Sequence, residues 1–151
     1  MTEYKTFLKR ISLVAEKTEI PRHRITSSQI SNDYIRQFFS DDIAIFESVF
    51  ILLLNRSNVA IGYAKISQGG VSGTVVDPKL VAKYAIDALA SGVIICHNHP
   101  SGNLEPSRSD DDITKKIQNG LNLFDIHLID HLIIVQDARS SYYSYKDEFK
   151  L

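Results

Sequence analysis

The sequence predicts a single domain of the α/β (α+β) class, in which helices flank a central β-sheet. Short, strongly apolar runs that are typical of buried strands alternate along the chain with segments of helical periodicity, and this order indicates one sheet covered by helices. The 151 residues, 44% of them hydrophobic, suffice for one sizeable core, whereas two domains of half this length would each lack buried surface.

The first half of the chain contains an arm, a helix and a hairpin. "YKTFLKRISLVAEKTEI" (4–20) indicates an edge strand or a loose arm. "SSQISNDYIRQFFSDD" (27–42) has apolar residues at helical spacing behind Ser and Asn caps, which predicts a short amphipathic helix. "ESVFILLLNRSNVAIGYAKIS" (47–67) has two β-rich runs around the turn residues "NRSN", which predict a hairpin whose first strand Glu47 opens. We therefore separate residues 1–44, an arm and short helix packed on the domain, from the domain itself, residues 45–151.

The second half alternates helices and buried strands. Asp77 and Pro78 suit the start of a helix that runs through "KLVAKYAIDALA" (79–90). "VIIC" (93–96) and "HLIDHLIIV" (127–135) are apolar runs of the kind that is buried on both faces of a sheet, and "SSYYSY" (140–145) indicates a short last strand or an ordered tail. The helix predicted from Ser107 onward carries one apolar stripe, which consists of Ile113, Ile117, Leu121 and Phe124, and it should end between Gly120 and Phe124.

Charge and cysteine content exclude several kinds of protein. Seventeen basic and eighteen acidic residues give a net charge of −1, so no overall field favours nucleic acid or an anionic membrane. The single cysteine, Cys96, excludes an internal disulfide and any site built from several thiolates, such as that of a zinc deaminase. The start "MTEYKTFLKR" has no leader pattern, and no apolar run reaches membrane-spanning length. We therefore expect a soluble cytoplasmic protein.

The loop "CHNHPSGNLEPSRSDDD" (96–112) follows a buried strand and is the strongest candidate for a site. In extended backbone His97 and His99 point to the same side, while Asn98 points away. A zinc ion would need a third protein ligand, and Asp110 is the natural candidate, although the spacing leaves its neighbours Asp111 and Asp112 open. Ser107 and Asp110 also fit a capping box, a pattern that starts a helix without any metal.

Catalysis at such a site requires a base and a group that stabilises negative charge. Zinc lowers the pKa of a bound water to about 7. Glu47, beside an apolar strand, could shuttle protons, or it could simply be a charged residue at a strand entrance. Ser107 could donate a hydrogen bond to a developing oxyanion, or it could be a plain cap.

Three further residues have structural interpretations. His127 and His131 flank "LID" on an apolar segment, where a histidine is more often a half-buried sheet residue than a ligand. Asp130 between them could orient a neighbouring imidazole. Alternation turns Cys96 away from His97, which indicates a small buried residue.

The spacing of these residues resembles a known motif. The pattern His97-x-His99, seven residues, then Ser107-x-x-Asp110, with Glu47 upstream, resembles the JAMM motif of the JAB/MPN metalloprotease superfamily. "GVIICHNHPSGNLEPSRSD" is more similar still to the RadC family, bacterial proteins with a JAB domain that have long been labelled DNA repair proteins. The similarity covers roughly residues 45 to 145.

The resemblance implies a fold, a metal and a reaction. The implied fold is the MPN type, a curved central β-sheet flanked by helices, with the layered architecture of cytidine deaminases as a related arrangement. One Zn²⁺ per chain would be held by His97, His99 and Asp110. Glu47 would act as general acid and base, and Ser107 would stabilise the tetrahedral intermediate during hydrolysis of an amide or isopeptide bond.

The resemblance implies a protein or peptide substrate as the partner. We expect no association with a membrane. The helix-hairpin-helix region that family members usually carry has no counterpart in the first forty-odd residues, so DNA binding rests on the family label and the basic segment 9–24. The rival hypothesis is a non-catalytic interaction module whose metal, if bound, is structural or vestigial. A third hypothesis is an accessory protein associated with DNA repair or recombination. The sequence predicts neither a particular substrate nor an oligomeric state.

Overall fold

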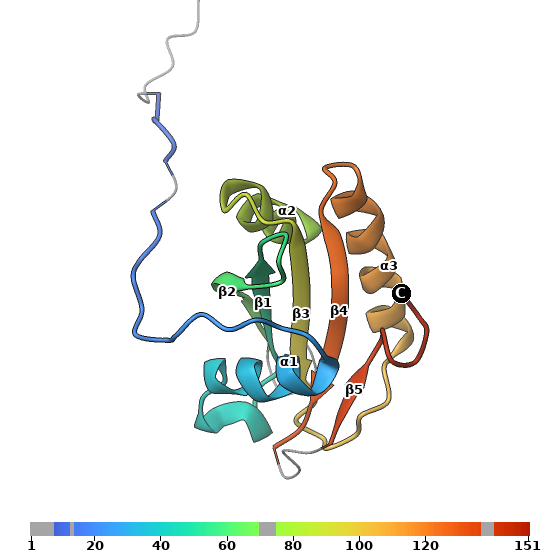
Figure 1. Ribbon diagram of the computed structural model, residues 1–151. Coiled ribbons are helices and arrows are strands. Elements are labelled where there is room, and N and C mark those ends of the chain that lie inside the picture. Colours follow the sequence, from blue (N-terminus) through green and yellow to red (C-terminus); the bar gives the residue numbers. More distant parts are fainter. Residues whose placement is uncertain (1–7, 13, 70–74, 137–140) are drawn as a thin grey trace, which may run out of the picture.

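The computed structural model describes residues 8–12, 14–69, 75–136 and 141–151, which form one mixed sheet with helices on both faces (Figure 1). The predicted α+β class is therefore confirmed. The strands are β1 (Ser48–Leu54), β2 (Ala60–Gln68), β3 (Gly92–Asn98), β4 (His127–Ile134) and β5 (Tyr142–Ser144). The helices are α1 (Ser28–Ile35), α2 (Pro78–Asp87) and α3 (Arg108–Asn122), with two short 3₁₀ turns, η1 (Arg36–Phe38) and η2 (Asp41–Ala44).

The five strands are arranged in the order β2-β1-β3-β4-β5. β1 and β2 form the predicted hairpin, and β3 pairs antiparallel with β1 and parallel with β4. β1 and β3 are buried along their whole lengths, as their continuous apolar sequences predict. The end of β3 therefore lies in the middle of the sheet, with β1 on one side and β4 on the other.

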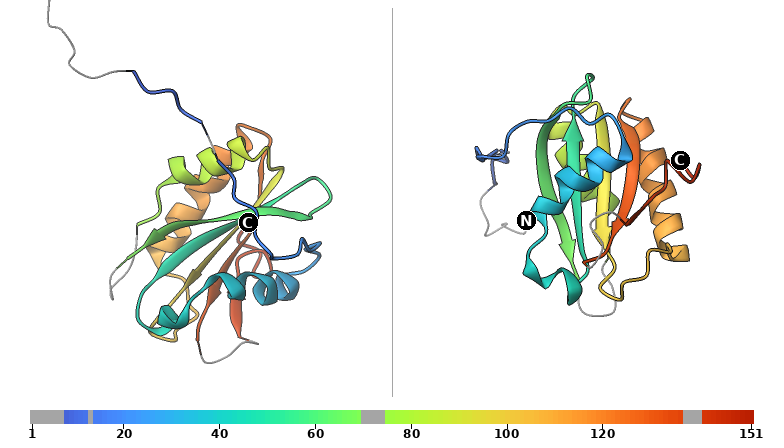
Figure 2. Two further views of the ribbon diagram at one scale, coloured as in Figure 1. Left: turned by 90° about the vertical axis from the view of Figure 1, so that its left-hand side faces the viewer. Right: turned by 60° about the horizontal axis from the view of Figure 1, so that its bottom comes forward.

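The sheet separates two hydrophobic clusters. Figure 2 shows α1 on one face of the twisted sheet and α2 and α3 on the other. Ile95 of β3 packs in the cluster on the α2 and α3 face, and Cys96 packs in the cluster on the α1 face. Since side chains alternate along a strand, His97 faces the same side as Ile95. Cys96 is fully buried and turned away from His97, as predicted.

The segment predicted as one helix over 27–42 is divided into α1, η1 and η2. Ser27 caps α1, because its hydroxyl oxygen accepts a hydrogen bond from the backbone N–H of Ile30. The helix ends early because the aromatic rings that follow pack on the sheet. Phe38 stacks on Tyr63 with ring centres 4.0 Å apart, and Phe39 lies 4.8 Å from Phe50.

Two details near helix ends also differ from the prediction. α2 ends at Asp87 rather than Ala90, because Leu89 adopts a positive φ of 52° and turns the chain toward β3. α3 ends at Asn122, within the predicted range of Gly120 to Phe124, but Phe124 lies beyond this end and is exposed, so its predicted place on the apolar stripe is wrong.

The N-terminal segment is an arm rather than an edge strand. Residues 8–12 and 14–20 contain neither helix nor strand and are largely exposed, while residues 1–7 and 13 lie outside the described part of the chain. The arm touches the sheet through one bridge between Arg24 and Val59. Within the described ranges, every helix is too short or too polar to pass through a lipid bilayer.

Candidate metal centre

The end of β3 presents two imidazoles to one point. His97 is the second-last residue of the strand and is buried, and His99 follows the strand in a partly exposed position. Their Nε2 atoms lie 2.9 Å apart, so both rings point the same way, as the extended backbone predicts. The side chain of the intervening Asn98 points to the opposite side.

The start of α3 adds a carboxylate to this point. Ser107 and Asp110 form the predicted capping box: the Ser107 hydroxyl oxygen accepts from the Asp110 N–H, and Asp110 Oδ2 accepts from the Ser107 N–H. The same carboxylate lies 3.5 Å from His97 Nε2 and 3.4 Å from His99 Nε2. Asp111 instead accepts a hydrogen bond from the Tyr145 hydroxyl, so it is Asp110 that lies beside the imidazoles.

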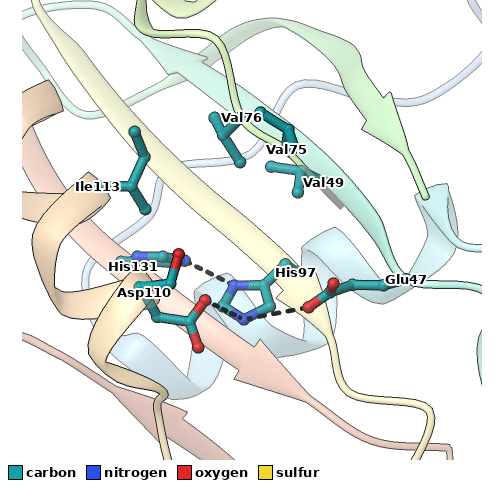
Figure 3. Close-up of a pocket in the computed structure, with 9 residues that line it drawn as sticks. Glu47, Val49, Val75, Val76, His97, Asp110, Ile113 and His131 are labelled. Carbon is teal, nitrogen blue, oxygen red and sulfur yellow. Dashed lines mark hydrogen bonds and ion pairs between the residues drawn. The ribbon is translucent and has the colours of Figure 1, made fainter. Parts of the chain in front are cut away.

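Glu47 completes the cluster from the neighbouring strand. It precedes β1 by one residue, and the next residue but one, Val49, pairs with His97. Glu47 Oε1 lies 3.9 Å from the Nε2 atoms of both His97 and His99. Figure 3 shows the Glu47 carboxylate pointing toward the His97 ring. One atom from each of these three side chains lies within 4.8 Å of the others, so the group could hold a metal ion.

The electrostatics of the cluster couple Asp110 to the two imidazoles. Burial alone would raise the pKa of the Asp110 carboxyl, but hydrogen bonds to His97 and His99 outweigh it and hold that pKa far below its usual range. Burial would likewise lower the pKa of His99, but Asp110 and the Asn103 carbonyl raise it overall. The Asp110 carboxylate and a proton on His99 therefore stabilise each other when no metal is bound.

The donor set fits a cation. His99 Nδ1 lies 2.7 Å from the Asn103 carbonyl oxygen, which can only accept, so the ring N–H is at Nδ1 and a neutral His99 turns the lone pair of Nε2 toward the cluster. Two imidazole nitrogens and two carboxylates thus converge, and the neutral imidazole and the carboxylates offer lone pairs at this point. Nitrogen and oxygen donors of this kind suit zinc.

A pocket of about 140 Å³ adjoins the cluster. Glu47, His97 and Asp110 line one side, and apolar side chains form the opposite wall, among them Val49, Val76 and Ile113 (Figure 3). The polar groups can therefore be reached by a ligand whose neighbouring part is apolar.

Asn98 fixes the segment that carries Glu47. Its amide group donates to the carbonyl oxygens of Ile43 (2.6 Å) and Phe46 (2.8 Å), and its own carbonyl oxygen accepts from the Ser48 N–H (2.7 Å). Asn98 is fully buried. The hydrogen bonds to Phe46 and Ser48 hold the backbone on either side of Glu47. Sequence reasoning placed Asn98 away from the histidines but did not assign it this task.

Replacing Asn98 with alanine should destabilise the protein by roughly 2–4 kcal/mol, because it leaves several buried backbone groups without their partner. Urea unfolding of the metal-free protein measures this loss. Asn122, exposed at the end of α3, provides the control, and Asn122→Ala should change stability by less than about 0.5 kcal/mol. Equal stability of the two variants would contradict the assigned role of Asn98.

His131 is the residue near the cluster that sequence reasoning missed. It was expected to be half-buried, but it is 2% exposed, and its Nε2 lies 2.7 Å from His97 Nδ1. Burial lowers the pKa of His131 well below its usual value. A register shift explains its orientation: Val93 pairs with Leu128, but Ile94 pairs with Asp130, and this extra residue in β4 brings His131 opposite Ile95, on the His97 face.

The neighbours of His131 do not join the cluster. His127 is a sheet residue at the start of β4, as interpreted, but it is exposed rather than half-buried. The suggestion that Asp130 orients an imidazole is wrong. Its carboxylate accepts hydrogen bonds from the Ser144 hydroxyl and from the backbone N–H groups of His131 and Lys146, and so ties β4 to the C-terminal segment.

The fold and the cluster together define an α+β domain with a candidate metal centre at the end of its central strand, and comparisons with known proteins agree. A family model described as the RadC-like JAB domain matches residues 25–150. The chain belongs to this family, and the resemblance seen in the sequence is confirmed.

Several relatives carry the name UPF0758 protein. The one from Flavobacterium johnsoniae is 47% identical over 102 residues, covering 68% of this chain and 43% of the relative. The one from Porphyromonas gingivalis is 40% identical over 131 residues, covering 86% of this chain and 56% of the relative. The one from Streptococcus gordonii is 34% identical over 149 residues, covering 99% and 64%. The chain thus spans about half the length of these relatives.

Proposed function

We propose that the chain is a zinc-dependent hydrolase of the JAMM type, which cleaves an amide or isopeptide bond in a protein or peptide. The observation that carries this proposal is the convergence of His97, His99, Asp110 and Glu47, from two strands and a helix, beside a pocket. A capping box alone would explain the position of the Asp110 side chain, but it does not explain why two imidazoles and a second carboxylate lie beside it.

The distances support Asp110 as the third ligand and Glu47 as the base. Ligands bonded to zinc at about 2.0–2.1 Å in a tetrahedron lie roughly 3.3 Å from one another. Asp110 is 3.4 and 3.5 Å from the two Nε2 atoms, whereas Glu47 is 3.9 Å from both. A carboxylate slightly farther away suits proton transfer better than coordination.

Each residue then has a task. Zinc, when bound, supplies a nucleophilic water at neutral pH and polarises the substrate carbonyl. Glu47 takes a proton from the attacking water and gives it to the amine nitrogen that leaves. Ser107, at the exposed start of α3, donates its hydroxyl hydrogen to the oxyanion of the tetrahedral intermediate. The apolar wall of the pocket binds an apolar side chain of the substrate next to the bond that is cleaved.

The test combines metal analysis with an unbiased search for cleavage. Protein purified without chelator should contain about one zinc per chain. Incubation with a proteome-derived peptide mixture, followed by mass spectrometry, should reveal new amino termini that disappear with chelator and return with zinc. Protein without zinc, or cleavage unaffected by chelator, would contradict the proposal. Bound zinc without any cleavage would favour the interaction module.

A further inference from the structure

A chain of buried hydrogen bonds connects the first turn of α3 to His97. The Thr114 hydroxyl lies 2.5 Å from the backbone carbonyl oxygen of Asp110 and 2.6 Å from His131 Nδ1. His131 Nε2 in turn lies 2.7 Å from His97 Nδ1. Thr114, His131 and His97 are each no more than 3% exposed, so bulk solvent has little access to these hydrogen bonds.

The chemistry of the groups determines the donor and the acceptor in each of these hydrogen bonds. A carbonyl oxygen can only accept, so the Thr114 hydroxyl donates its one hydrogen to Asp110. The Thr114 oxygen must then accept from His131, which places the hydrogen of that ring on Nδ1. A neutral imidazole carries one N–H, so His131 Nε2 accepts, and His97 must donate from Nδ1. In a neutral His97 the remaining nitrogen, Nε2, then carries the lone pair and directs it at the cluster.

We propose that Thr114 and His131 are positioning residues that hold His97 in the tautomer able to bind a metal. The group on the far side of a ligating imidazole sets which nitrogen is free, and the Asn103 carbonyl does this for His99. His97 lacks such a carbonyl and uses a second imidazole instead. The inference rests on the metal site of the proposed function.

Two further contacts make this arrangement specific. The His131 ring stacks on Tyr145, with centres 4.9 Å apart and planes 10° apart, which fixes the plane in which Nε2 faces His97. The chain of hydrogen bonds also begins on Asp110, whose carboxylate lies 3.5 Å from His97 Nε2. The series of hydrogen bonds therefore begins and ends at residues of the cluster. A change at Thr114 affects both Asp110 and His97, because its hydroxyl is bonded to the backbone of the first and, through His131, to the ring of the second.

Matched variants at two positions test the role. Thr114→Val keeps the shape of the side chain and removes the hydroxyl, whereas Thr114→Ser keeps the hydroxyl. His131→Leu removes both ring nitrogens, whereas His131→Gln retains an acceptor and a donor. Zinc affinity is measured by competition with a chromophoric chelator, and thermal unfolding of each metal-free variant reports whether it folds.

We expect Thr114→Val and His131→Leu to weaken zinc binding by about 10- to 100-fold, which is typical for residues that orient a ligand. Thr114→Ser and His131→Gln should restore most of the affinity. Long-range ¹H–¹⁵N spectra of the wild-type chain should show His131 with its hydrogen on Nδ1, with and without zinc. If His131→Leu does not fold, the zinc affinity of Thr114→Val and the spectra of the wild-type chain still test the positioning role.

The outcomes separate this inference from the proposed function. Unchanged zinc affinity in Thr114→Val, or a hydrogen on His131 Nε2, would overturn the positioning role and leave the hydrolase proposal intact. Zinc binding that depends on Thr114, in a protein that cleaves no peptide, would support the positioning role and contradict the hydrolase. A wild-type chain that binds no zinc would contradict both, whatever tautomer His131 adopts.

Discussion

Replacing His97 with alanine is expected to reduce the zinc content from about one ion per chain to less than about a tenth of that. His97 is the most buried member of the cluster, and its Nε2 is within 4 Å of Glu47, His99 and Asp110. A zinc site with three protein ligands retains only two without it. Metal analysis after dialysis in chelator-free buffer measures the loss.

Two pairs of variants control this experiment. His127→Ala removes an exposed imidazole of the neighbouring strand and should leave the zinc content unchanged. Asp110→Asn should lower the zinc content, while Asp111→Asn, which affects a residue bonded to Tyr145, should not. Full zinc content in His97→Ala would show that the metal lies elsewhere, and equal effects at the two aspartates would remove the preference for Asp110.

Replacing Glu47 with glutamine should lower kcat by about 10²- to 10⁴-fold while zinc stays bound. Glutamine keeps the size of the side chain and the hydrogen-bonding oxygen but cannot accept and release a proton. Glu47 is farther from the two imidazoles than Asp110 is, so its loss should affect proton transfer more than coordination. The measurement is the rate on a peptide that the wild-type chain cleaves, with zinc content determined in parallel.

Glu105→Gln is the matched control, because Glu105 is an exposed carboxylate in the loop between His99 and α3. It should leave kcat and zinc content unchanged. Full activity in Glu47→Gln would show that another group is the base. Loss of zinc in that variant would instead identify Glu47 as a ligand, in keeping with its 4.8 Å grouping with the two histidines.

The parts of the cluster that could be predicted from the sequence are set by local geometry. His97 and His99 face the same way because an extended chain alternates its side chains, and Asp110 turns toward its own N-terminal cap because Ser107 begins a helix. Cys96 faces away from His97 for the same reason of alternation. Each of these rules needs only a few neighbouring residues, which is why the sequence suffices for them.

The parts that could not be predicted depend on contacts between distant segments. His131 faces His97 only because an extra residue in β4 shifts the pairing with β3, and a local pattern does not reveal such a shift. Asn98 holds a backbone segment about fifty residues earlier in the chain. Phe124 continues the apolar stripe in the sequence, but α3 ends before it, so helical periodicity placed it in the core wrongly.

The register shift in β4 decides which face of the sheet carries His131. If Ile129 were instead paired regularly with Ile94, every side chain that follows would face the opposite side, because strand geometry repeats every two residues. The imidazole of His131 would then point toward α1, away from His97. Deleting Ile129 would keep His131 opposite Ile95, so a shorter β4 is compatible with the cluster, whereas the present sequence needs the shift to place this imidazole there.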